Sequence, residues 1–185
     1  MQNLMEIRRL DINTLSRREK YSIYGLALII ILAMLGFGRM IVLETSGLAY
    51  VFIALGFALL AVIFHELAHG LAYYLYTGKV KFGVRWKTKL GLVAYAVSLG
   101  SILPKSKIMI VALAPQVMTV VILAMLPFLI QVNSWLPYPL LMFAIMNCAG
   151  GCADFYLVWL LLRQKGEIYI EDMGTSQIIY RRGAV

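Results

Sequence analysis

One motif limits how this chain can fold, because His65-Glu66-Leu67-Ala68-His69 lies inside an otherwise apolar run. Between Gly47 and Gly78, Glu66 is the only formally charged side chain. An apolar run of this length predicts a membrane-spanning helix, in which an ionisable side chain is costly and normally functional. The run therefore predicts both a long helix and the position of a functional site on it.

The two histidines of the motif are the only histidines in the chain. In a helix, His65 and His69 are one turn apart and project to the same side, where two imidazoles can hold one zinc ion. Glu66 projects about 100° around the helix, from where it can act as a general base toward water. The spacing therefore predicts a zinc site with Glu66 as the catalytic residue. A hydrogen-bonded pair of core histidines is the alternative.

The composition indicates a membrane protein. The 185 residues are 62% hydrophobic, and the mean hydropathy is +0.82. The net charge is +8, but the basic residues are clustered beside apolar runs, so we expect no nucleic-acid partner. The two cysteines, Cys148 and Cys152, lie in one apolar run and predict no disulfide framework.

Four apolar runs predict an α-helical membrane protein with four transmembrane helices, at about 21–43, 48–76, 108–130 and 138–162. Together they form one predicted membrane-embedded domain over residues 1–185. Sixteen of the seventeen lysines and arginines lie before the first run, between the second and third, or after the fourth. The positive-inside rule then predicts a multi-pass plasma-membrane protein with both termini in the cytoplasm.

The connection between the second and third predicted helices has a strand pattern. Over residues 80–87, apolar side chains alternate with basic residues or glycine, and 92–97 is a second extended segment. We expect an amphipathic β-hairpin over about 79–98 at the membrane surface, with an edge to which an unwound substrate strand can pair. Four apolar side chains of the first strand are expected to point inward: Val80, Phe82, Val84 and Trp86. A basic surface loop is the alternative.

A catalytic zinc ion needs a third protein ligand. Over residues 108–162 the only charged residue is Asp154, about eight residues from the cytoplasmic end of its helix and roughly 12 Å deep. His69 lies at a similar depth, roughly 10 Å from the end of the second helix. The matching depth makes Asp154 the expected third ligand. Three acidic residues beyond the fourth helix are the alternative ligands: Glu167, Glu171 and Asp172.

Asn147 lies seven residues before Asp154, so the two side chains share one face of a helix. We expect Asn147 either to hydrogen-bond the substrate backbone or the oxyanion, or to make a contact between helices. Gly150 and Gly151 would let this helix approach the motif helix closely. Pro115, inside the third run, predicts a kink.

The order of these motifs along the chain resembles that in known proteins. HELAH is followed by a strand region, by Ala114-Pro115, and then by Asn147 and Asp154. The chain resembles the small bacterial membrane proteins of the zincin peptidase family, which are related to the site-2 protease clan. The matching segments are HELAHG, VKFGV and LAPQV, and the resemblance covers most of residues 60–160. Two features differ from the site-2 proteases. Phe155 follows Asp154 where a glycine is usual, and the proline normally present between the Asn and the Asp is missing.

The resemblance implies that His65, His69 and Asp154 bind zinc and that Glu66 is the catalytic base. We therefore expect a zinc-dependent intramembrane endopeptidase that hydrolyses peptide bonds in or next to membrane segments. Its substrate would be a membrane protein or a membrane-tethered peptide, and its surroundings the lipid bilayer. Two alternatives are a non-proteolytic zinc-binding membrane protein and a membrane-bound metalloprotease that acts on soluble segments at the cytoplasmic face.

Overall fold

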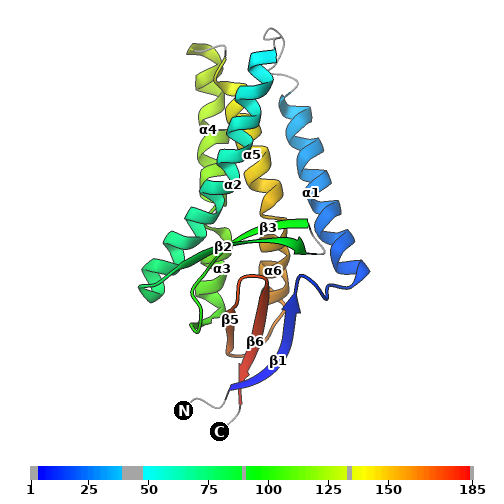
Figure 1. Cartoon of the computed structure of the whole chain (residues 1–185), viewed down its shortest axis with the longest axis vertical. Helices are drawn as coiled ribbons and strands as arrows, with labels where there is room; N and C mark the ends of the chain where they lie inside the picture. The colour runs from blue at the N-terminus through cyan, green and yellow to red at the C-terminus, as the bar shows by residue number, and fades with distance from the viewer. Residues whose placement is uncertain (1–3, 39–47, 89–90, 133–134, 184–185) are drawn as a thin grey trace. The chain divides into compact units, whose positions relative to one another are not determined.

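The computed structural model describes residues 4–38, 48–88, 91–132 and 135–183. These residues form six helices and six strands (Figure 1). They fall into two compact units. The first contains the described parts of 1–21, 66–114 and 154–185, and the second those of 22–65 and 115–153. In chain order the elements are β1 (Leu4–Asp11), α1 (Arg17–Gly38), α2 (Leu48–Thr77), β2 (Lys81–Thr88), β3 (Gly91–Val97), β4 (Ile102–Pro104), α3 (Lys105–Leu113), α4 (Gln116–Val132), α5 (Pro137–Gly150), α6 (Cys152–Leu162), β5 (Ile168–Asp172) and β6 (Ser176–Arg182).

The first unit is built on a four-stranded antiparallel sheet in the order β1-β6-β5-β4. β5 shows why the sheet forms: Ile168, Ile170 and Asp172 are buried, and the residues between them are more exposed, so alternate side chains line one face. β1 pairs with β6 from opposite ends of the chain, with Leu4 opposite Arg182. No local pattern predicts a pairing across such a separation in sequence.

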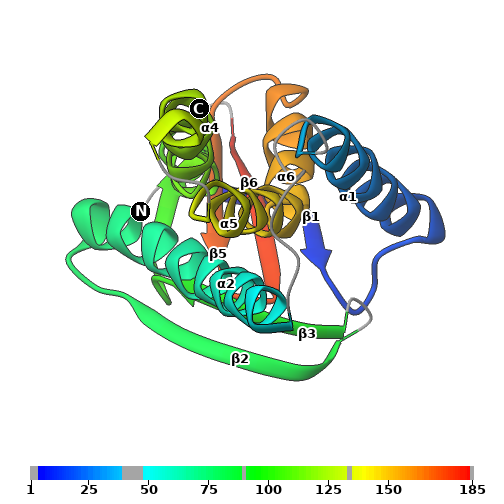
Figure 2. The ribbon, with the colours of Figure 1, turned by 90° about the horizontal axis from the view of Figure 1, so that it is seen from above.

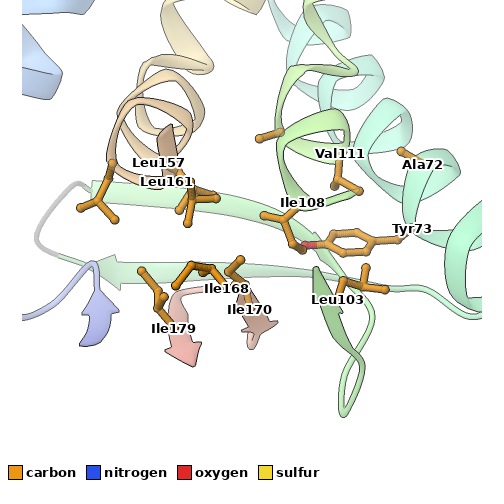
Figure 3. Close-up of a cluster of buried hydrophobic side chains, with 12 residues drawn as sticks. Ala72, Tyr73, Leu103, Ile108, Val111, Leu157, Leu161, Ile168, Ile170 and Ile179 are labelled. Carbon is orange, nitrogen blue, oxygen red and sulfur yellow. The ribbon is translucent and has the colours of Figure 1, made fainter. Parts of the chain in front are cut away.

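The core of the first unit lies between this sheet and three helices. Figure 3 shows side chains of α3 and α6 pointing toward those of β5 and β6, with Tyr73 of α2 beside them. Buried members of the cluster include Ile108, Leu161, Ile170 and Ile179, of which the last three have no exposed surface. The sheet therefore fixes the C-terminal part of α2 and the helices α3 and α6 around one apolar core.

A capping box begins α1 in the same unit. The backbone N–H of Glu19 donates to Ser16 Oγ, and the Glu19 carboxylate accepts from the Ser16 N–H and hydroxyl. The same carboxylate accepts hydrogen bonds from Arg8 of β1 and from the Tyr156 hydroxyl of α6. One acidic residue thus starts the helix and joins it to the sheet and to α6.

The second unit is made of helices only, among the described residues. Leu126 of α4 and the α5 residues Leu141 and Ile145 form its buried cluster, and Ile31 and Met34 of α1 pack against it. Figure 2 shows α4 and α5 side by side. α2 belongs to both units as one unbroken helix of 30 residues, about 45 Å long.

The prediction of a four-helix membrane protein is wrong, because the structure is a mixed α/β fold with two sheets. Among the described residues, one helix, Val51–Thr77, is long and apolar enough to cross a membrane, or up to three if each of two bent pairs counts as one span. The third and fourth predicted spans are broken, at Pro115 and at Gly151. Part of the first, 39–43, lies outside the described residues. Mean hydropathy measures the apolar content of a segment and does not show where a helix ends.

The predicted hairpin is present, and β2 pairs antiparallel with β3. Its apolar side chains do not all point inward as expected. Val80 packs against the core of the first unit, but Phe82, Val84 and Trp86 are 47%, 52% and 75% exposed. The second edge of β2 has no partner strand among the described residues, so pairing with a substrate stays a prediction.

Candidate metal centre

The helix α2 places His65 and His69 one turn apart, and both are buried. Asp154 lies in the first turn of α6, where a carboxylate is favoured by the helix dipole. Its Oδ2 atom is 3.4 Å from Nε2 of His69. The structure therefore brings together the three residues that the sequence predicted as metal ligands.

The three side chains form a group that could hold a metal ion. Each offers one ligand atom, and these atoms lie within 4.8 Å of one another. Two ligand atoms of a tetrahedral zinc site, each about 2.0–2.1 Å from the metal, are about 3.3 Å apart. The distance of 3.4 Å between His69 Nε2 and Asp154 Oδ2 matches that separation. Two imidazoles and one carboxylate form a donor set typical of catalytic zinc, which retains one open position.

A backbone carbonyl orients His69. The Val111 oxygen at the end of α3 is 2.8 Å from His69 Nδ1, and because a carbonyl only accepts, Nδ1 carries the hydrogen. In a continuous helix this carbonyl would accept from the N–H of residue 115, but Pro115 has none. The Val111 carbonyl accepts the Ala114 N–H at 3.2 Å, and the proline leaves its second lone pair available to the histidine. Nε2 of His69 then becomes the nitrogen that faces the metal position.

Asn147 orients His65 in the same manner. Its Oδ1 accepts from His65 Nδ1 at 3.1 Å, while Nδ2 donates to the Pro115 carbonyl at 2.8 Å and to Thr119 Oγ1 at 2.7 Å. The side chain is 1% exposed. These hydrogen bonds join different helices, which is one of the two roles that the sequence predicted for Asn147. A contact with the substrate backbone or the oxyanion stays a prediction.

The alternative acidic ligands are engaged elsewhere. Glu167 pairs with Arg182 at 2.8 Å, and Glu171 accepts from the Tyr180 hydroxyl at 3.0 Å. Asp172 accepts from the Tyr73 hydroxyl at 2.5 Å and from the Gly174 N–H at 2.8 Å. Burial raises the pKa of the Asp172 carboxyl to about 6, although these two hydrogen bonds favour its charged form. All three side chains make contacts within the four-stranded sheet or between that sheet and α2.

The sequence did not lead us to predict two groups that orient the histidines: the Val111 carbonyl and the Thr119 hydroxyl. A signal for the first was present, since a proline in an apolar helix frees the carbonyl four residues earlier. Thr119 offered only a small polar side chain in an apolar run, which is too common a pattern to indicate a site.

Comparison with known proteins identifies the family. Residues 58–169, more than half of the chain, match the family described as "Putative zincin peptidase", and the chain belongs to this family. The matched segment contains the motif on α2, the hairpin and Asp154. No curated protein and no solved structure matches the chain. The match confirms the resemblance to zincin peptidases and supports a metal ion, with zinc as the expected one, at His65, His69 and Asp154.

Asn147→Ala is expected to lower the zinc affinity by about 10–100-fold, the usual effect of removing the partner of a ligating histidine. The affinity can be measured by competition with a chelator of known affinity. Asp154→Ala, which removes a ligand, should lower it further. Cys148→Ala, a neighbouring substitution outside the network, should not change it. Equal affinities for wild type and Asn147→Ala would show that Asn147 does not hold His65 in place.

Pro115→Ala is expected to lower the zinc affinity by roughly 10-fold, because an N–H at position 115 can compete with His69 for the Val111 carbonyl. Pro127→Ala is the control, since Pro127 lies inside α4 and should affect only that helix. The same chelator competition measures both variants. If Pro115→Ala binds zinc as tightly as wild type, the freed carbonyl is not what orients the imidazole.

Proposed function

We propose that this protein is a zinc-dependent endopeptidase in which His65, His69 and Asp154 hold the metal and Glu66 is the catalytic base. The observation that carries the proposal is that each histidine donates its Nδ1 hydrogen to a buried oxygen. Each imidazole is thereby fixed with Nε2 toward the position that the Asp154 carboxylate also approaches. Membership of the zincin peptidase family supports the same activity.

The chemistry divides between the metal and the protein. Zinc, when bound, polarises the scissile carbonyl and lowers the pKa of water from 15.7 toward ~7. Glu66 follows His65 directly and is half-buried, about 100° around α2 from it. Its carboxylate takes a proton from the attacking water as the new C–O bond forms, and delivers that proton to the departing amine as the C–N bond breaks. Water is the only co-reactant, and no oxidant is needed.

We further propose that the substrate is cleaved in or next to a membrane segment. Two observations support this. The helix that carries both histidines is long and apolar enough to cross a membrane, and His69 is eight residues from the end of that segment, about 12 Å along it. A motif on a membrane helix with an aspartate on a later helix is also the pattern through which the chain resembles the site-2 protease clan. Membrane proteins or membrane-tethered peptides are the proposed substrates.

Glu66→Gln is expected to retain zinc and the fold but to lose proteolysis, since an amide cannot accept the proton of water. Zinc content of the purified variant and cleavage of a membrane-tethered test peptide are the two measurements. Asp154→Ala should instead lose both zinc and cleavage. Cleavage by Glu66→Gln at the wild-type rate would exclude Glu66 as the base. Zinc binding by a wild-type protein that cleaves nothing would favour the non-proteolytic alternative.

The distribution of basic residues leads us to propose that the hairpin and both termini are cytoplasmic, in a bacterial plasma membrane. Single cysteines at positions 87 and 183, in a background without Cys148 and Cys152, should react with an impermeant maleimide only in inside-out vesicles. Reaction in detergent is the control for accessibility. Labelling of either position in right-side-out vesicles would disprove this orientation.

A further inference from the structure

Gly70 lies on the same side of α2 as the proposed catalytic base. It follows Glu66 by four residues, so the two side-chain directions differ by about 40°. The Cα–Cβ bonds of a helix lean toward its N-terminus, so a group that covers Gly70 lies over the turn that carries Glu66. Whatever covers Gly70 therefore borders the side of the helix from which the base acts.

Phe82 of β2 covers Gly70. Gly70 is buried, and a methyl group on its Cα would overlap the Cζ and Cε1 atoms of the Phe82 ring. Val80 is the next neighbour, 3.4 Å from that position. Only a glycine lets the ring approach the helix this closely, and this explains the glycine that directly follows His69.

The Phe82 ring contacts the helix by its tip, and about half of the residue is exposed. Phe82 is 47% exposed, whereas Val80, which lies just before β2, packs against the core of the first unit. The hairpin thus presents a large apolar surface next to the helix turn of Glu66. A ring with two side-chain torsions and a fixed tip is a rigid surface for another apolar group.

Tyr95 holds the hairpin from its other face. Tyr95 is opposite Gly83 in the β2–β3 pair, and successive residues of a strand face opposite sides, so its ring lies on the face away from Phe82. The ring covers both Gly83 and Gly174, and a methyl group on either glycine would overlap it. Gly174 is in the turn between β5 and β6 and has a φ of +86°. The hairpin is therefore fixed between α2 and the four-stranded sheet.

We propose that Phe82 forms the apolar wall of the peptide-binding site on the Glu66 side and determines the size of the substrate side chain accepted there. This inference rests on the proposed peptidase function. Phe82 fills the space beside the helix turn of Glu66, so it limits that side chain to a small or medium apolar group. Removing the ring opens space for a larger one, and enlarging it closes that space.

Peptide binding to the full-length, zinc-loaded protein in detergent tests this wall, with Glu66→Gln present to prevent cleavage. The probes are three fluorescein-labelled peptides that differ only in one central residue: alanine, leucine or phenylalanine. Phe82→Ala is expected to shift the ratio of the dissociation constants of the alanine and phenylalanine peptides about 10-fold in favour of the phenylalanine peptide. Phe82→Trp is expected to shift it toward the alanine peptide. Damage to the fold would not produce shifts of opposite sign.

Trp86→Ala is the matched control, since Trp86 is a more exposed aromatic residue four positions further along β2. It should leave the ratios unchanged, and every variant should keep its zinc. Ratios that stay at the wild-type value in both Phe82 variants overturn the proposal, as does the absence of saturable binding by all three peptides. If the ratios shift but the same protein with Glu66 restored cleaves no peptide, the peptidase function is overturned and the role of Phe82 in peptide binding still holds.

Discussion

The missing N–H of Pro115 is the constraint on which the metal centre depends. The proline removes the N–H that would bond the Val111 carbonyl in a continuous helix, and that carbonyl, which also accepts from the Ala114 N–H, accepts the Nδ1 hydrogen of His69. The carbonyl of Pro115 itself accepts from Asn147, whose amide oxygen holds His65. One break between α3 and α4 therefore fixes both imidazoles. Without this break between α3 and α4, the histidine pair of α2 would have the spacing for zinc but no defined tautomer or ring orientation.

Burial makes these hydrogen bonds consequential. The exposed fraction of each of the two histidines and of Asn147 is 8% or less. In such surroundings an unpaired polar group costs about 1–3 kcal/mol, so a satisfied network selects a single arrangement of the side chains. The same reasoning applies to Asp172, whose carboxylate in the core of the first unit receives hydrogen bonds from Tyr73 and Gly174. This contact joins β5 to α2 one helical turn beyond His69.

The α/β unit supplies more than a scaffold for the helix. It provides Asp154 at the start of α6, and it carries the hairpin whose Phe82 rests on Gly70. Holding the metal and, as we propose, lining the peptide site are thus tasks of different elements. The candidate metal site rests on α2, on Asp154 and on the break at Pro115. Substrate selection, as we propose it, rests on a glycine that lets an aromatic ring reach the helix beside Glu66.

The sequence by itself indicated which three residues could hold a metal ion. The spacing of His65 and His69 follows from the helical repeat, Asp154 is the only charged residue in two apolar runs, and the alternation over 80–87 is a local strand pattern. Tertiary structure decided the rest. The fold class was mistaken because hydropathy does not register helix breaks or a sheet that pairs residue 4 with residue 182. The partners of the histidines and of Gly70 are contacts between distant segments, and no local periodicity encodes them.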